Sequence, residues 1–535
     1  MKTKYSTIFI LLCGLAACEF VSMIHVYLSN QEILCNMKKL SEISYLIVPN
    51  KHIFPLLDSI KTCIYGGLFF TLTLGIGISL LSLFLLLTLN KINTKDNYEF
   101  TLLKKIKILN SNNFTVSKKK CYIVFLIIFW VSLILITNIN GFNFSSFYLL
   151  FIPLSIIISF KIFNKNKNKI IFFDRINIIP IGFIFFVILI IIPDISFINI
   201  RDYILLSNKH LEKISDFYYK YTLFPSEAFK PMELKLINTY SINDDYSKSQ
   251  NYDTIKKRLI KRLERLDYFL IQDIKNNLNI TIDDNNIIFH FHDKIILKTD
   301  YKEFFKDSQK ILKKVSNITD RHFFLRYLTF LSLIFGLPLF TYLIIYIFLF
   351  FCSELIFLKL LKIKFSIKYQ FIVISSLMVI LSLLIISIFP DNDEKNITKD
   401  KINSDLKSKN LIKRVNALKN ILKNKYDISN FIEYENLLNT DNTAEKYWLV
   451  RSFGISSNYK TYEKIFNFIN DKSIIVRCQS LHALSKRGLR SSINKIIPII
   501  QESKEWYVQL YAYKALKRLG WNQSLTYKKN FINKK

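Results

Sequence analysis

Long uninterrupted apolar runs dominate the chain as far as Phe389. A helix needs about 20 consecutive apolar residues to cross the hydrocarbon core of a bilayer. Seven runs meet or approach this length: Thr7–Leu28, Ile64–Leu89, Cys121–Ile139, Phe147–Phe163, Ile178–Ile198, Leu328–Phe351 and Gln370–Phe389. The pattern predicts a multi-span α-helical membrane protein.

Lysine gathers in three of the loops between these runs, at 91–120, 161–175 and 359–368. Short cytoplasmic loops carry an excess of Lys and Arg, so we expect these three to face the cytoplasm. The loops at 30–63 and 140–146 lack that excess and fit the opposite side. Together they predict a cytoplasmic N-terminus and a C-terminal domain outside the plasma (inner) membrane of a bacterium.

The first run permits two interpretations. Leu15-Ala16-Ala17-Cys18 resembles a bacterial lipoprotein cleavage box, which would make Cys18 a lipidated residue. The apolar character resumes from Phe20 to Leu28, which favours an uncleaved anchor helix. Neither choice alters the later spans.

Two segments have the mixed composition of soluble domains. In the first, Ile255–Ile271 has apolar residues at helical spacing, Thr281–Thr299 is typical of short strands about polar turns, and Lys302–Val315 is typical of a helix. We expect an extracytoplasmic α+β domain here. The predicted organisation is an anchor or lipoprotein-like signal at 1–29, an external loop at 30–63, transmembrane helices at 64–200, the α+β domain at 201–325, transmembrane helices at 326–390, a charged linker at 391–410 and a repeat domain at 411–525.

The repeat domain is visible as an internal periodicity. Aligned units start at Lys413, Glu445, Val476 and Val508. Small or apolar residues occupy offsets four, seven and eight of each unit, which places them on one face of a helix. A second amphipathic helix is predicted in each of the first three units, at Ile428–Leu438, Tyr459–Ile469 and Ile493–Ile500. Gly454, Gly488 and Gly520 stand where the first helices should end.

This stretch resembles the HEAT-repeat family in its short-period, PBS-lyase-like form, whose pattern reads Val-Arg, then Ala, then Ala-Leu-Gly. The third unit matches best, with Val476-Arg477, Ala483-Leu484 and Gly488, whereas the first two units depart from the pattern at its opening Val-Arg. The resemblance implies a C-terminal α-solenoid and, in general, protein–protein binding rather than catalysis.

The net charge of +33 changes the picture only in part. Ile, Asn, Lys, Phe and Tyr are abundant while Gly and Pro are scarce, a bias typical of AT-rich genomes, so we do not read the charge as a nucleic-acid signal. From Asp391 onward, however, Lys and Arg outnumber Asp and Glu two to one. Basic candidates for partner binding in the repeats are Arg477, Lys486, Arg487, Arg490, Lys514, Lys517 and Arg518.

Other residue patterns suggest no chemistry. The seven cysteines show no CxxC spacing, and His290 and His292 share a predicted strand face without an obvious third ligand. Glu19, His25 and Asp194 are the ionisable residues near span interiors, and all lie within reach of a span end. We find no catalytic, cofactor or metal motif and predict none.

The sequence therefore predicts a membrane-anchored HEAT-repeat scaffold that presents soluble domains to proteins of the cell envelope. Three alternatives stay open. The chain could be a transporter or channel subunit with accessory soluble domains, or the HEAT domain could face the cytoplasm and bind an acidic partner or nucleic acid. The third is a membrane enzyme acting on a lipid or glycan, which would need acidic or histidine residues converging at the outer interface.

Overall fold

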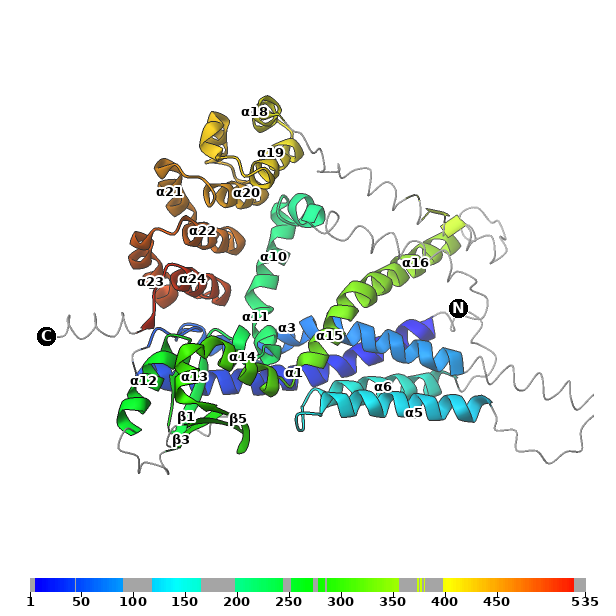
Figure 1. Ribbon diagram of the computed structural model, residues 1–535. Helices are drawn as coiled ribbons and strands as arrows, with labels where there is room; N and C mark the ends of the chain where they lie inside the picture. Colours follow the sequence, from blue (N-terminus) through cyan, green and yellow to red (C-terminus); the bar gives the residue numbers. More distant parts are fainter. Residues whose placement is uncertain are drawn as a thin grey trace, which may run out of the picture. The chain divides into compact units, whose positions relative to one another are not determined.

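A computed structural model of the chain describes residues 5–43, 45–89, 118–164, 198–243, 252–272, 278–283, 286–355, 373–374, 376–377, 380 and 398–523. The chain divides into two compact units (Figure 1). The first unit comprises Met1–Val26, Cys63–Pro193 and Arg321–Ile388, and the second comprises Tyr27–Thr62, Asp194–Asp320 and Phe389–Lys535. Each unit is described by itself below.

The first unit is built from long apolar helices. Four helices of the described residues are long and apolar enough to cross a membrane: Ile8–Glu42, Ile60–Leu89, Ser146–Phe163 and Phe323–Ile345. A shorter apolar helix covers Cys121–Thr137. The predicted runs beginning at Thr7, Ile64, Phe147 and Leu328 coincide with the four long helices, which is compatible with a membrane protein. The predicted spans at Ile178–Ile198 and Gln370–Phe389 lie almost wholly outside the described residues.

The described elements of this unit include the first part of α1 (Tyr5–Glu42), α3 (Ile60–Phe70), the π-helical turn η1 (Thr71–Gly75), α5 (Lys118–Thr137), α6 (Ser146–Asn164), α15 (Phe323–Leu331), the π-helical turn η4 (Ser332–Gly336) and α16 (Leu337–Leu355). Two of these helices approach closely at η1 and η4. A Cβ atom added at Gly336 would lie 3.2 Å from the Cα of Gly77, and the Ser332 hydroxyl donates to the Thr73 carbonyl. Small residues thus allow close helix contact, as they do between the helices of membrane proteins.

The helix α1 is longer than the sequence suggested. It continues to Glu42, so the first part of the predicted external loop at 30–63 is helical. The reason is visible in the side chains, because Leu34, Met37 and Leu40 are buried at a spacing of three residues in the second unit. The remaining part of that segment carries the short helix α2 (Phe54–Leu57) and the first residues of α3.

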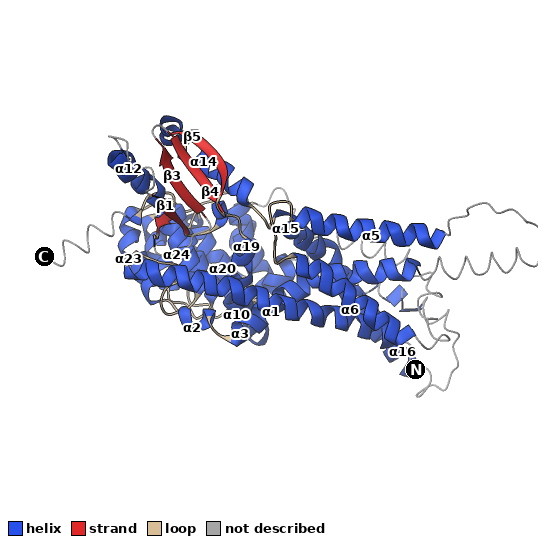
Figure 2. Ribbon diagram, turned by 90° about the horizontal axis from the view of Figure 1, so that it is seen from below, coloured by secondary structure: helices blue, strands red, loops and turns tan. Residues whose placement is uncertain are grey.

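The described residues of the second unit form one five-stranded sheet in the order β2-β1-β3-β4-β5 (Figure 2). Its strands are β1 (Asn238–Asn243), β2 (Tyr268–Leu270), β3 (Leu278–Asp283), β4 (Asn286–Phe291) and β5 (Lys294–Asp300). The strand β1 runs parallel to both β2 and β3, whereas β3, β4 and β5 are antiparallel. The helices α12 (Tyr252–Glu264), α13 (Tyr301–Lys306) and α14 (Ser308–Thr319) share a buried core with the sheet.

The sequence predicted an α+β domain with two helices and the later strands, but it did not predict β1 or β2 and it misplaced two helix boundaries. The predicted helix Ile255–Ile271 ends at Glu264, because Asp267 adopts a left-handed conformation with φ of 64° and the next residues join β1 as the parallel strand β2. The predicted helix Lys302–Val315 is divided at Asp307, whose side chain accepts a hydrogen bond from the Lys310 amide and so caps α14.

Four helices of the C-terminal region pack in sequence order: α19 (Leu411–Lys423), α20 (Thr443–Phe453), α22 (Ile474–Arg487) and α24 (Trp506–Arg518). They begin within a few residues of the four aligned unit starts. Every residue at offsets four, seven and eight is buried, as the periodicity predicted. A further helix, α18 (Lys399–Lys407), packs against α19.

The elements between these helices vary. The first connection contains only the 3₁₀ helices η6 (Ile428–Asn430) and η7 (Ile432–Leu437) where an amphipathic helix was predicted at Ile428–Leu438. The second contains α21 (Tyr459–Ile465) and η8 (Phe466–Phe468), and the third contains η9 (Arg490–Ser492) and α23 (Ile493–Glu502). The predicted helix–helix units are therefore clearest from Thr443 onward.

The segment that precedes the sheet packs against the four repeat helices. It consists of η2 (Ile200–Leu205), α10 (Lys209–Tyr221), α11 (Leu223–Phe229) and η3 (Met232–Leu234). Figure 1 shows α10 alongside the column of repeat helices, and it contacts both α22 and α24. This arrangement brings Asp202 on η2 beside Trp448 on α20.

Candidate functional site

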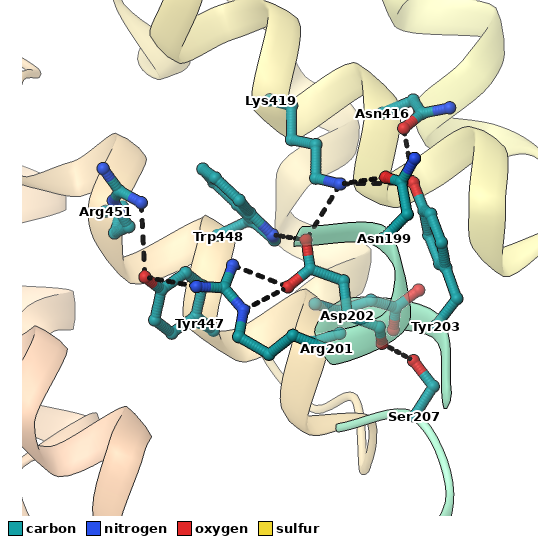
Figure 3. Close-up of polar contacts among 12 residues, drawn as sticks. Asn199, Arg201, Asp202, Tyr203, Ser207, Asn416, Lys419, Tyr447, Trp448 and Arg451 are labelled. Atoms are coloured by element: carbon teal, nitrogen blue, oxygen red, sulfur yellow. Dashed lines mark hydrogen bonds and ion pairs between the residues drawn. The ribbon is translucent and has the colours of Figure 1, made fainter. Parts of the chain in front are cut away.

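A buried carboxylate, Asp202, connects the π-helical turn η2 to the first two repeat helices (Figure 3). Its side chain is 0% exposed. Oδ2 lies 2.8 Å from Nζ of Lys419 on α19 and accepts a hydrogen bond of 2.8 Å from the indole Nε1 of Trp448 on α20. Oδ1 lies 2.7 Å from the guanidinium of Arg201. A buried charge needs such partners, because it loses its hydration on burial and only ion pairs and hydrogen bonds compensate for that loss.

Aromatic rings surround the cations of this site. The Arg201 guanidinium lies 4.6 Å from the Tyr447 ring centroid, and Lys419 Nζ lies 4.7 Å from that of Tyr203. Arg451 stacks over Trp448 at 4.7 Å. Cations are attracted to the electron-rich faces of such rings. The rings therefore hold three cations near the Asp202 carboxylate, two of which pair with it directly.

The pKa of Lys419 reflects both its burial and the charges around it. Burial lowers the pKa of Lys419, the Asp202 carboxylate opposes this shift, and the nearby Arg201 adds to it. The ion pair with Asp202 thus keeps the largely buried Lys419 ammonium charged. Removing the carboxylate would leave Lys419 without its counter-charge and beside the cationic Arg201.

Lys419 is one of four equivalent residues. Lys419, Arg451, His482 and Lys514 each stand six residues after the aligned unit starts, on α19, α20, α22 and α24. One turn further on, Lys486 and Arg518 occupy offset ten of the last two units. We call these six residues the basic ladder. Because the four helices pack in order, the ladder continues from one repeat to the next.

His482 is the centre of the second half of the ladder. Its Nδ1 lies 3.0 Å from Nη1 of Arg518, so it accepts a hydrogen bond from that guanidinium as a neutral ring. Burial lowers the pKa of His482 to about 4, and the charges of Arg518, Lys486 and Arg451 add to the shift. No described carboxylate opposes it. Among the described residues, none offers an ion-pairing carboxylate to Arg451, Lys486 or Arg518.

The ladder lies beside the face that α10 covers. Burial raises the pKa of Tyr219 on α10, and Cys478 and Tyr447, which both stand at offset two, add to this shift. The ladder residues follow these positions one helical turn later. Glu212 of α10 accepts a 2.6 Å hydrogen bond from Thr443, and the Tyr219 ring lies 5.1 Å from that of Tyr507. The segment 199–222 thus lies along all four repeat helices as a bound intramolecular ligand would.

The structure separates the seven predicted partner-binding residues into two groups. Three have intramolecular roles. Arg487 donates to the carbonyls of Ser456 and Asn458, Lys517 pairs with Asp267 at 2.9 Å, and Arg477 interacts electrostatically with Asp216 of α10. Each of these contacts joins one segment of the second unit to another.

The other four residues are the exposed ones. Lys486, Lys514 and Arg518 belong to the basic ladder, with Lys514 near both Glu227 and Lys230. The Arg490 guanidinium lies against Gly520, where an added Cβ would meet it at 3.2 Å. Sequence reasoning missed Lys419, Arg451 and His482, although their common offset was a signal that could have found them.

The polar residues of the apolar helices make local contacts. Glu19 accepts a 2.8 Å hydrogen bond from the Thr71 hydroxyl, and His25 lies within hydrogen-bond distance of the Tyr148 hydroxyl, at 3.2 Å. Asp194 lies outside the described residues. In the described part of the chain no three His, Cys, Asp or Glu side chains gather as metal ligands would, and His290 instead lies 2.9 Å from the Thr281 hydroxyl.

Comparison with protein-family models, with curated proteins and with solved structures finds no match to this chain. The geometry of the site therefore carries the functional argument.

Proposed function

We propose that this chain is a membrane-anchored scaffold whose C-terminal repeat helices bind an acidic segment of a partner protein. Four apolar helices of spanning length support the anchor. The order of α19, α20, α22 and α24, with buried small residues at equivalent offsets, supports a HEAT-like solenoid. Repeats of this kind offer extended surfaces for binding.

One observation carries the choice of ligand. Asp202 is a carboxylate from another segment of the chain, and the first position of the basic ladder holds it by an ion pair with Lys419 and a hydrogen bond from Trp448. The second unit presents Arg451 at the equivalent position, and the fourth unit presents Arg518 one helical turn beyond it. A side-chain carboxylate from a partner would form ion pairs with these arginines, as Asp202 does with Lys419. Such charge-assisted hydrogen bonds are stronger than neutral ones.

The lysine-rich loops support a location of this domain outside the cytoplasmic membrane, where partners would be envelope proteins. A protein ligand suits the site better than nucleic acid, because the ladder includes only a few cations and alternates with Tyr447, Tyr511 and other aromatic residues. Aromatic and Arg side chains are enriched where protein interfaces concentrate their binding energy.

The test is a titration of full-length protein in nanodiscs of neutral lipid with fluorescent hexaglutamate and hexalysine peptides. We expect hexaglutamate to bind and hexalysine not to bind. The variant R451Q/R518Q should weaken hexaglutamate binding about tenfold or more, since each charged hydrogen bond contributes about 1.5–3 kcal/mol.

A matched control removes the same number of charges elsewhere. Lys472 and Lys504 are exposed residues of the repeat region outside the ladder. The variant K472Q/K504Q has the same net charge as R451Q/R518Q and should bind hexaglutamate within about twofold of the unaltered chain. Equal losses in the two variants would show non-specific attraction to a basic protein and would overturn the proposal.

A further inference from the structure

The helix α10 has two faces of different character. Asp216 and Tyr219 are directed at the repeat helices: the Asp216 carboxylate accepts a hydrogen bond from the Ile474 amide, and Tyr219 stacks edge-on against Tyr507. Residues at positions 212, 216 and 219 share one side of a helix. The contacts on this side attach α10 to the repeat helices of the second unit.

The opposite side of α10 is apolar and exposed. Ile214 is 55% exposed, Phe217 is 41% exposed and Tyr218 is 49% exposed. Phe217 and Tyr218 stand three and four residues after Ile214, so the three side chains lie on one side of the helix and form a continuous patch. Large apolar side chains grouped in this way mark an interaction surface more often than scattered ones do.

Two exposed lysines border the patch. Lys213 precedes Phe217 by four residues and Lys220 follows it by three, so both lie along the same edge of the helix. A third lysine, Lys209, is 82% exposed and meets Asp441 only at 4.0 Å. The helix thus combines an apolar face, aromatic rings and a basic margin, which are the features of helices that lie in a membrane interface.

The position of α10 in the chain identifies what covers this face. The apolar run Ile178–Ile198 has the length of a membrane span, and α10 begins at Lys209, a few residues after it. The connecting turn η2 exposes a further apolar side chain, Ile204, which is 42% exposed. A chain that has just left a bilayer at about residue 198 keeps α10 within reach of the headgroups.

We propose that α10 is an interfacial helix whose Ile214, Phe217 and Tyr218 insert among lipid headgroups, with Lys213 and Lys220 bound to anionic phosphates. Because its other face holds Tyr507 and the Ile474 amide, the helix fixes the repeat helices at the membrane surface. The basic ladder would then present its ligand site close to the bilayer. This inference does not depend on the ligand of the ladder.

The experiment uses a photoreactive phenylalanine analogue, benzoylphenylalanine, incorporated at position 217 or 218 of the full-length protein. The protein is reconstituted in vesicles of phosphatidylcholine with or without phosphatidylglycerol, irradiated, and analysed by mass spectrometry for lipid adducts. The matched control position is Tyr459 on α21, an aromatic residue that is 62% exposed. We expect lipid adducts at 217 and 218 at least tenfold above those at 459.

The lysines supply a second readout. Lipid adducts should increase when phosphatidylglycerol is included, by about fivefold for each lysine that contacts the anionic surface. The variant K213E/K220E should abolish this increase. Crosslinks at 217 and 218 that form only with protein, or lipid adducts no more frequent than at 459, would overturn the proposal. A phosphatidylglycerol-dependent increase in lipid adducts that K213E/K220E retains would also overturn it.

Discussion

The indole of Trp448 donates a 2.8 Å hydrogen bond to Oδ2 of Asp202, the same carboxylate oxygen that pairs with Lys419. A turn that follows a predicted membrane span is thereby fixed to two successive repeat helices. The contact is a structural junction, and it is also the basis of the proposal that the basic ladder recognises acidic segments. The predictions below separate these two roles.

Removal of the Asp202 carboxylate should destabilise the second unit. D202A leaves Lys419 and Arg201 without their counter-charge in a buried site, and breaking such pairs costs about 3–5 kcal/mol. The free energy of unfolding can be measured in guanidinium through the tryptophan fluorescence of the chain. The comparison variant is D441N, because Asp441 and Lys209 meet at 4.0 Å with side chains 90% and 82% exposed. We expect D441N to change stability by less than about 0.5 kcal/mol, and a similar small effect of D202A would contradict the proposed role of the network.

Acid should weaken the fold through His482. Burial and three neighbouring cations lower the pKa of this imidazole from 6.5 to about 4 in the folded chain. Between these values the unfolded state binds the proton and the folded state does not, so stability falls as the pH drops from 6.5 towards 4. The contribution is complete above 6.5 and absent below 4. The ring is partly exposed and screened, so we expect a loss of about 1–2 kcal/mol.

The control for this pH dependence is H482Q, which can still accept a hydrogen bond from Arg518 but does not titrate. Urea unfolding at pH 7.5 and pH 5 should show a smaller difference for H482Q than for the unaltered chain. An identical difference in both proteins would assign the acid sensitivity to other groups.

Two glycines that end repeat helices should respond to alanine for different reasons. Gly488 has φ of 71° and no atom within 4 Å of an added Cβ, so G488A should cost about 1 kcal/mol from backbone strain alone. At Gly454 the added Cβ would lie 3.1 Å from the Cα of Ala483 on the neighbouring helix α22. Overpacking of this kind costs about 1–3 kcal/mol.

A double variant distinguishes the two effects. A483G should relieve part of the cost of G454A and none of the cost of G488A, as read from thermal unfolding. Additive effects of A483G and G454A would show that the two helices do not approach as closely as described.

The sidedness of the C-terminus tests the proposed location. A reporter that works only outside the cytoplasm, fused after Lys535, should be active, and a reporter that works only inside should be silent. Activity of the inside reporter alone would place the repeat helices in the cytoplasm and redirect the search to cytoplasmic acidic partners.

Local patterns in the sequence predicted local structure well. The offsets of small and apolar residues located the four repeat helices, and all twelve residues at offsets four, seven and eight are buried. The strands after Leu278 followed from their composition. The predicted helix Ile255–Ile271 failed at its end, where Asp267 adopts φ of 64° before β2.

The candidate site could not be predicted in the same way. Asp202 and Trp448 are 246 residues apart, and nothing in either local sequence indicates the other. Selecting basic residues by their density favoured Arg487 and Lys517, which have intramolecular partners. The shared offset of Lys419, Arg451 and His482 was present in the sequence, but its meaning depends on which face of the helices α10 covers.

The most direct measurement of the central claim is an exchange of ligand preference. R451E/R518E replaces two cations of the basic ladder with carboxylates, and its binding to hexaglutamate and hexalysine can be compared with that of the unaltered chain by fluorescence anisotropy in neutral-lipid nanodiscs. If the ladder recognises acidic segments, the variant should lose hexaglutamate binding and gain hexalysine binding, while K472E/K504E, which carries the same net charge, retains the original preference. Unchanged binding of hexaglutamate to R451E/R518E, or equal responses of the two variants, would contradict the account.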